Sequence, residues 1–414
     1  VWSSTDAASW QVETVPGIDT EGTSLTDVAL GPGGALVTGF RSDDATTVAV
    51  VWHRSPAGEW AEVDLGAGPG SRVDAVVDRG DGFVVGGIVG GGATSDPATW
   101  ATADGRTFKQ PTTAFPELVP NVIRSGGASI TDLARRGDRL IASSDSSSGR
   151  GISVSDDGSA WRQWEQPIVD TPGYAVAPPV IDVGLDGTGR PLAVVADGPN
   201  LLVPTGDGWG EASGAAEVLD LDREIVRLAA TTVHEGAPVI VGTVETVARP
   251  GRPSAVTTTV WSRARDGWSE VRADDLPAIA WWDVTSTDLG PVAVGNQVFR
   301  RSTSDSDQAA VATGDDDRWT RVAGTPNQVA RTLTAVAPWD GGWVAVGFRL
   351  REDATRAAGA AKEAVVVRGA SDTGTELAIP VALDGVDARP EADHALTGVC
   401  TGATGVVVVG EVTE

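Results

Sequence analysis

An apolar stretch rich in valine and glycine returns eight times along this chain of 414 residues. The copies read ALVTGF from Ala35, FVVGGI from Phe83, LIASSD from Leu140, PLAVVA from Pro191, PVIVGT from Pro238, PVAVGN from Pro291, WVAVGF from Trp343 and VVVVGE from Val406. Their starts lie 47 to 63 residues apart, a period typical of stacked small sheets and not of helical solenoids. Each small sheet must bury its faces against its neighbours. The repeat therefore predicts an all-β chain folded as a β-propeller.

The composition agrees with this prediction. Glycine (52) and proline (24) are frequent, methionine is absent, and the 15 tryptophans favour strands over helices. An apolar fraction of 41% is sufficient for a packed core. A chain of this length would ordinarily contain two or three domains, but eight blades of about fifty residues make a single domain.

The first full repeat, residues 26–65, shows how one blade is built. TDVAL, ALVTGF, VAVVW and WAEVDL read as four short strands, with turns rich in glycine and proline between the first two and the last two. A large aromatic residue opens the fourth strand in most repeats, and we expect these rings to pack between neighbouring blades. They are Trp10, Trp60, Phe108, Trp161, Trp209, Trp268 and Trp319.

The turn before these aromatics also repeats, as TADGRTF from Thr102, SDDGSAW from Ser155, TGDGW from Thr205, SRARDGW from Ser262 and, more weakly, STDAASW from Ser4. It resembles a shortened Asp-box, the turn of sialidase-like (BNR-like) bacterial propellers. The resemblance implies a structural motif in which the aspartate accepts backbone N–H groups, the glycine takes a positive φ and the aromatic fills the core. Asp104, Asp157, Asp207 and Asp266 would be its aspartates. The motif does not imply sialidase activity, because Arg227 is the only arginine at the aligned inner-strand position.

The two ends of the chain predict how the propeller closes. The last repeat has only two strands, and the first seventeen residues read as the missing third and fourth strands, so N-terminal strands should complete the C-terminal blade. The count is eight blades, or seven if the weak repeat at Pro191–Gly214 belongs to a neighbour. The predicted blades span residues 26–65, 73–113, 130–167, 180–214, 225–274, 280–324 and 333–380, with a composite of 396–414 and 1–17.

Charge and cysteine content restrict partners and location. The formal net charge of −26 excludes a basic nucleic-acid surface. The single cysteine, Cys400, excludes an internal disulfide framework. The sequence contains no run of eighteen apolar residues, so it predicts no transmembrane segment. The chain begins with Val1, which we interpret as processing that removed a signal peptide or anchor. The residue bias resembles that of an actinobacterium, and we expect an extracytoplasmic, secreted or anchored, bacterial protein.

The long connections lie on one face of the predicted propeller, opposite the tight turns, and long loops commonly carry binding groups. We therefore expect that face to be functional. Its candidate residues are Tyr174, Trp281, Trp282, Arg249, Arg252, Arg349, Arg351 and Arg356. Adjacent tryptophans on one strand point to opposite faces, so one of Trp281 and Trp282 should be exposed.

Carboxylates recur near the same face, at the start of the innermost strand. When the repeats are aligned by their second strand, five of them have an aspartate at this position: Asp27, Asp74, Asp132, Asp182 and Asp283. The other three have Arg227, Thr334 and Thr397. A carboxylate ring at the channel mouth could hold Ca²⁺. The alternative, which we favour, is that each aspartate accepts N–H groups of the inter-blade connection. No other cofactor is expected.

Catalytic motifs are missing from the sequence. The three histidines lie in different repeats without ligand spacing, and neither a phosphate-binding loop nor a nucleophile elbow is present. The sequence thus favours a non-enzymatic, extracytoplasmic scaffold that presents its long-loop face to a protein of the cell envelope. The alternative is a carbohydrate-binding or carbohydrate-active propeller that uses the channel mouth, with its aspartates as acids and a tryptophan as sugar platform.

Overall fold

The computed structural model of the chain consists of strands and their connections. It describes residues 1–18, 22–42, 46–90, 95–109, 112, 128–136, 139–146, 149–163, 169–171, 174–176, 180–185, 191–197, 200–205, 208–211, 224–246, 255–264, 267–272, 276, 279–297, 308–314, 318–322, 332–350, 362–370, 373–378, 393–402 and 405–413. Every regular element within these ranges is a β-strand. No helix in the described part of the chain has the length and apolarity needed to cross a membrane.

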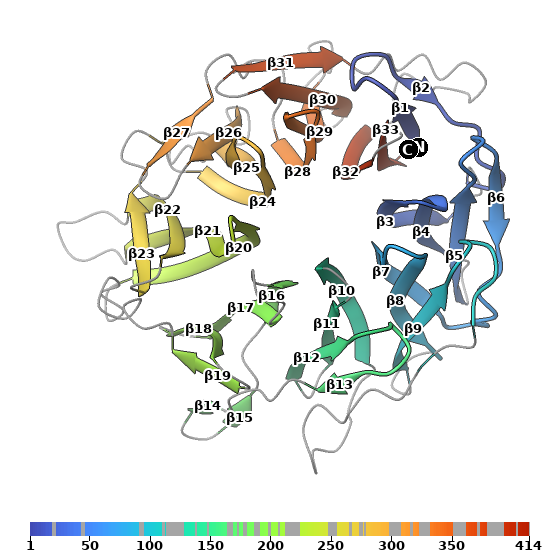
Figure 1. Cartoon of the computed structure of the whole chain (residues 1–414), viewed down its shortest axis with the longest axis horizontal. Helices are drawn as coiled ribbons and strands as arrows, with labels where there is room; N and C mark the ends of the chain where they lie inside the picture. The colour runs from blue at the N-terminus through green and yellow to red at the C-terminus, as the bar shows by residue number, and fades with distance from the viewer. Residues whose placement is uncertain are drawn as a thin grey trace, which may run out of the picture. The chain divides into compact units, whose positions relative to one another are not determined.

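The chain divides into two compact units. Unit 1 comprises Val1–Glu13, Gly198–Asn200 and Ala212–Glu414, and unit 2 comprises Thr14–Asp197 and Leu201–Glu211. Each unit is a succession of small antiparallel sheets in which strands pair in chain order, as Figure 1 shows.

Unit 2 contains the sheets of the N-terminal repeats. The first is β3 (Thr23–Gly31), β4 (Gly34–Ser42), β5 (Thr47–Arg54) and β6 (Trp60–Val63), and the second is β7 (Arg72–Asp78), β8 (Phe83–Val89) and β9 (Asp96–Thr102). The third is β10 (Ala128–Arg136), β11 (Arg139–Ser146), β12 (Gly149–Ser155) and β13 (Arg162–Gln163). A hairpin of β14 (Val169–Thr171) and β15 (Tyr174–Val176) precedes the fourth, which is β16 (Val180–Leu185), β17 (Pro191–Asp197), β18 (Asn200–Thr205) and β19 (Gly208–Glu211).

Unit 1 contains the sheets of the C-terminal repeats. They are β20 (Glu224–His234), β21 (Ala237–Thr246), β22 (Ala255–Ala264) and β23 (Gly267–Arg272); β24 (Ile279–Thr287), β25 (Gly290–Gln297), β26 (Gln308–Gly314) and β27 (Trp319–Arg321); and β28 (Thr332–Trp339), β29 (Gly342–Leu350), β30 (Lys362–Ala370) and β31 (Thr373–Ala378). The last sheet has the order β2 (Gln11–Val12), β1 (Trp2–Ser4), β33 (Gly405–Thr413) and β32 (Asp393–Gly402). The N-terminal strands therefore pair with the C-terminal strands, as the sequence predicts, with Trp2 opposite Val408.

Neighbouring sheets of a unit contact one another through their first strands. In unit 2 β3 contacts β7, and β10 contacts both β7 and β16; in unit 1 β24 contacts β20 and β28, and β28 contacts β32. Contact through the first strands is typical of propeller blades. The predicted all-β repeat fold of propeller type is thus confirmed.

A β-bulge in the first strand of each repeat explains the recurring glycine. The pairing register shifts by one residue at the same place in every first strand, for example between Leu25 and Asp27 in β3. A bulge kinks its strand and increases the local twist. In most sheets a glycine stands directly opposite the bulge, and at five of these glycines an added Cβ would lie 2.0–2.2 Å from a backbone carbonyl oxygen of the bulged strand. Such glycines are Gly39, Gly87, Gly295, Gly347 and Gly410. Only glycine allows so close an approach without displacement of the backbone.

Four of the predicted fourth-strand aromatics fill the seams between sheets. Trp319 is 1% exposed and packs with Val239 and Val260 of the preceding sheet. Trp161 lies against Val84 and Ala101 of the preceding sheet, and its indole N–H donates to Thr99 Oγ1 at 2.9 Å. Phe108 and Trp10 pack at equivalent seams. The predicted packing is confirmed for these four residues. Trp60 is half-buried, and its packing in a seam stays a prediction, while Trp209 and Trp268 have no described side chain.

The turns before these aromatics have the expected hydrogen bonds. Asp104 Oδ1 accepts the backbone N–H groups of Thr107 at 2.7 Å and Arg106 at 2.8 Å, and Gly105 has a φ of 71°. These donors lower the pKa of Asp104 to about 2. Asp157 and Asp6 accept N–H groups in the same way. The turn geometry is thus observed, whereas the relationship to sialidase-like propellers stays a prediction. Asp207 and Asp266 lie outside the described residues.

Candidate functional site

Three of the predicted first-strand aspartates bind backbone at the bulge. Asp27 Oδ1 accepts the N–H of Val28 at 2.7 Å, and its Oδ2 accepts the N–H of Val76 on β7 at 2.8 Å. Asp283 repeats this pattern with Val284 and with Val336 on β28, both at 2.8 Å. Asp132 Oδ1 accepts the N–H of Leu133 at 2.8 Å. In the first two cases one carboxylate connects two adjacent sheets.

The register corrects the predicted alignment of the carboxylates. Asp27, Asp132, Asp182 and Asp283 each follow the extra residue of the bulge. In contrast, Asp74, Thr334 and Thr397 are that extra residue, and Arg227 lies two residues before it. Alignment by the second strand missed this because a bulge adds a residue to one strand only. The five aspartates therefore do not form one equivalent ring. The side chains of Asp182 and Arg227 are not described.

Asp74 has different partners from the other carboxylates. Its Oδ1 lies 2.7 Å from Arg72 Nε, and Ser129 Oγ donates to its Oδ2 at 2.7 Å. Through Ser129 it also connects two sheets, but with side-chain donors. In the described part of the chain no group of three His, Cys, Asp or Glu residues is arranged for a metal ion. The bonds of Asp27 and Asp283 are structural, as in the reading that we favoured, but their donors lie in the strands and not in the inter-blade connection. A calcium site at these aspartates stays a prediction.

The environment of Asp27 predicts a pH dependence of stability. Burial raises the pKa of Asp27 to about 7, although the hydrogen bonds from the N–H groups of Val76 and Val28 act in the opposite direction and lower it. Because the pKa in the unfolded chain is about 4, folding favours the protonated form. The stability from this group is fully present below about pH 4 and is lost as the pH rises to about 7.

We expect Asp27→Asn to flatten this dependence. Between pH 4.5 and 7.5 the wild-type protein should lose on the order of 1 kcal/mol relative to the variant, a value reduced because the carboxylate is partly exposed to solvent. Urea unfolding of both proteins at the two pH values measures the difference. Parallel pH profiles would contradict the assignment.

The adjacent tryptophans on β24 differ in exposure, as strand alternation predicts. Trp281 is 4% exposed, whereas Trp282 is 54% exposed. Trp282 is the extra residue of the bulge, and its indole N–H donates to Asn296 Oδ1 at 2.7 Å. It is one of four large apolar residues that are exposed in the described part of the chain.

Most of the predicted long-loop residues lie outside the described ranges. Arg249, Arg252, Arg351 and Arg356 are among them. Arg349 is described and forms a bidentate ion pair with Glu363, with both N–O distances 2.9 Å. Tyr174 is placed by its backbone in the β14–β15 hairpin, so the long connection predicted around this residue contains a two-stranded sheet.

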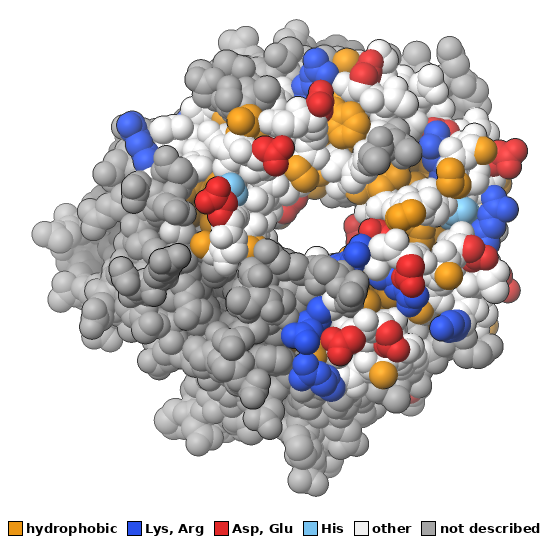
Figure 2. All heavy atoms as spheres, viewed as in Figure 1, with side chains coloured by type: hydrophobic (Ala, Val, Ile, Leu, Met, Phe, Trp, Pro, Cys, Tyr) orange, Lys and Arg blue, Asp and Glu red, His pale blue; other side chains and the backbone are white. Residues whose placement is uncertain are grey.

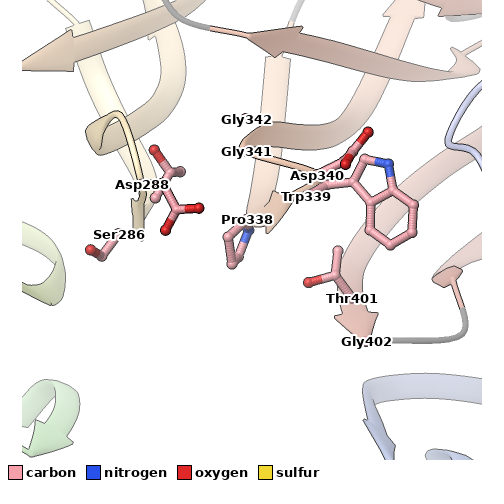
Figure 3. Close-up of a pocket in the computed structure, with 10 residues that line it drawn as sticks. Ser286, Asp288, Pro338, Trp339, Asp340, Gly341, Gly342, Thr401 and Gly402 are labelled. Carbon is pink, nitrogen blue, oxygen red and sulfur yellow. The ribbon is translucent and has the colours of Figure 1, made fainter.

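A pocket of about 390 Å³ lies on the opposite, tight-turn side of unit 1. The hairpin turns of three successive sheets line it, so we call it the turn-side pocket: Ser286, Thr287, Asp288, Pro338, Trp339, Asp340, Gly341, Gly342, Thr401 and Gly402. Figure 3 shows Ser286 and Asp288 on one side, Trp339, Asp340 and Thr401 on the other, and Pro338 between them. Sequence reasoning missed this site because it assigned binding to the long connections. The Trp339–Asp340 pair at a hairpin tip was the available signal.

Backbone geometry fixes the walls of this pocket. Asp340 and Gly341 have φ values of 45° and 72°, which are the two positive values of a type I′ hairpin turn. Thr287 is buried; its Oγ1 donates to Gly290 O at 2.7 Å and accepts the N–H of Leu289 at 3.1 Å. Ser286 Oγ is hydrogen-bonded to His234 Nδ1 of the preceding sheet at 3.0 Å. The lining groups are thus held on short, hydrogen-bonded turns.

The two carboxylates of the turn-side pocket lack counterions among the described residues. Asp288 and Asp340 are both exposed, and no described side chain or N–H donates to either carboxylate. Elsewhere arginines pair with acids, as in Arg72–Asp74, Arg79–Asp81 and Arg135–Asp78, and Figure 2 shows the two signs of charge intermingled on the face in view. The turn-side pocket therefore combines free negative charge with an aromatic ring.

The comparisons with known proteins support the fold of the chain but assign it to no family. No protein-family model matches the sequence, and no curated protein matches it either. Sqt1 of Chaetomium thermophilum is similar over 96% of this chain and 96% of that chain, with 12% identity and a TM-score of 0.54. At this identity the similarity is one of fold.

Two further solved structures are less similar to this chain. PorZ, a surface component of the type-IX secretion system of Porphyromonas gingivalis, is 13% identical over 99% of this chain and 65% of that chain, with a TM-score of 0.42. The β-propeller domain of the Trilobed protease from Pyrococcus furiosus is 7% identical over 85% of this chain and 83% of that chain, with a TM-score of 0.37.

Proposed function

We propose that the protein is a non-enzymatic interaction scaffold, and that a partner protein docks on the tight-turn side of unit 1. The observation that carries the proposal is the turn-side pocket, where the hairpin ends of three successive sheets combine apolar groups with free carboxylates. Leu289, beside the pocket residue Asp288, is 52% exposed, and Pro338 is exposed as well. An apolar centre with a polar rim is typical of protein interfaces.

We retain the proposal that the protein is extracytoplasmic and bacterial with a cell-envelope partner, which composition alone supports. We place the docking surface on the tight-turn side of unit 1 because the turn-side pocket is described there, and the long-connection face stays a second proposal. Eight blades remain the proposed count.

Carbohydrate binding is the second candidate function. Trp282, at the bulge of β24, presents an exposed indole beside the amide of Asn296. An aromatic face with an adjacent polar group suits a sugar ring. Here the observation is a single exposed ring without a described pocket, so the scaffold is the better supported function.

Site-specific photocrosslinking in the native host tests the scaffold. We expect a benzophenone amino acid at position 289 to capture a defined partner, whereas the same group at Val48, which is 38% exposed in unit 2, should not. The purified partner should then bind Leu289→Asp at least about tenfold more weakly than wild type, because a buried charge enters the interface. Val48→Asp is the matched control. Equal capture at both positions, or unchanged affinity of Leu289→Asp, would refute this docking surface.

A further inference from the structure

The turn-side pocket offers a specific chemistry to its ligand. It contains two carboxylates, Asp288 and Asp340, and the half-buried ring of Trp339, while no lysine or arginine is among the described residues that line it. Two negative charges would repel an anionic ligand. A neutral ligand would leave both charges uncompensated after water is displaced. The pocket is therefore complementary to a cation.

The aromatic ring narrows the class of cation. A guanidinium or ammonium group over an indole face is attracted by the ring quadrupole. Arginine fits best, because its planar guanidinium stacks on aromatic faces and also donates paired hydrogen bonds to a carboxylate. The volume of about 390 Å³ is within the usual range of ligand pockets, roughly 300–1,000 Å³. The net charge of −26 would further favour a basic partner during encounter.

We infer that the turn-side pocket binds an arginine side chain from a basic segment of the partner protein. This inference rests on the proposed scaffold function and specifies its ligand. The guanidinium stacks on Trp339 and donates hydrogen bonds to Asp288 and Asp340, while Leu289 and Pro338 contact apolar groups that flank the arginine in the segment.

A defined peptide pair tests the inference by isothermal titration calorimetry. The probe is a short, end-blocked peptide with one arginine between leucines, and its matched control has citrulline, which keeps the shape without the charge. We expect the arginine peptide to bind at least about tenfold more tightly to the full chain, from one charge-assisted pair. Trp339→Ala should weaken this binding by about 2- to 30-fold.

Conservative variants distinguish binding in the pocket from a general effect of the protein's negative charge. Asp340→Asn and Asp288→Asn should each weaken binding of the arginine peptide by about tenfold and leave binding of the citrulline peptide unchanged. Asparagine tolerates the positive φ at position 340, and matching thermal melts would show that the variants are folded. Glu59→Gln, an exposed position in unit 2, makes the same charge change and should have no effect.

Each outcome decides a different proposal. Equal binding of the two peptides, or equal weakening by Glu59→Gln, would overturn the arginine site. Saturable binding of a neutral oligosaccharide that is lost in Trp339→Ala would overturn it in favour of a glycan site. A partner crosslinked through position 289 together with equal binding of both peptides would preserve the docking surface and remove only the arginine. Arginine-selective binding without such a crosslink would preserve the pocket and remove the proposed partner surface.

Discussion

Replacing Trp319 by alanine is expected to lower the free energy of unfolding by about 4 kcal/mol, within the range measured for buried aromatic-to-alanine changes. The ring is 1% exposed and fills the seam between the β20–β23 and β24–β27 sheets. Its removal deletes apolar contacts on both sides and leaves a cavity that stiff strands cannot collapse around. Urea unfolding monitored by circular dichroism measures the loss, and hydrogen exchange at β26 and β27 amides would locate it.

The same sheet provides the matched control for this prediction. Trp282→Ala removes a ring that is 54% exposed, so we expect a cost of about 1 kcal/mol or less. Trp319→Phe should lose less than half as much stability as Trp319→Ala, because the phenyl ring refills most of the seam. If both alanine variants were equally stable, the seam aromatics would not hold neighbouring sheets together.

Gly347→Ala is expected to cost about 2 kcal/mol through overpacking. A Cβ at this position would lie 2.0 Å from the carbonyl oxygen of Thr332, opposite the bulge of β28. The backbone must separate there to admit a methyl group. The loss should appear as a lower urea midpoint with an unchanged slope.

Two other positions check the reason for this cost. At Gly33 an added Cβ would meet nothing closer than Phe83 at 3.6 Å, so Gly33→Ala should be neutral or slightly stabilising. Ser144 in β11 and Val195 in β17 stand opposite the bulge at the equivalent places, which shows that two sheets accommodate a larger residue there and limits the expected cost to a few kcal/mol. A neutral Gly347→Ala would mean that the recurring glycine has another cause.

Much of the fold could be predicted because its causes are local. Apolar alternation and glycine-rich turns determine strands and hairpins at short range. The seam role of Trp161 and Trp319 followed from repetition at one strand position. The pairing of β1 with β33 followed from an incomplete last repeat, whose edge requires a partner.

The candidate site could be predicted only in part. Exposure of one ring of the Trp281–Trp282 pair follows from strand alternation, but the choice of Trp282 depends on the bulge. Asp74 was grouped with Asp27 because their repeats align by the second strand. Only inter-strand pairing shows that these two aspartates occupy different register positions.

By itself, then, the sequence determined the period, the all-β class, the order of strands within each sheet and the residues that could fill the seams, since these depend on neighbours along the chain. Tertiary structure decided the rest. The bulge register depends on steric contact between paired strands, as at Gly347 and Thr332. The turn-side pocket brings together Asp288, Asp340 and Thr401. Successive members of this set are about fifty to sixty residues apart in the sequence. No local pattern could bring them together, because only the packing of successive sheets places their turns side by side.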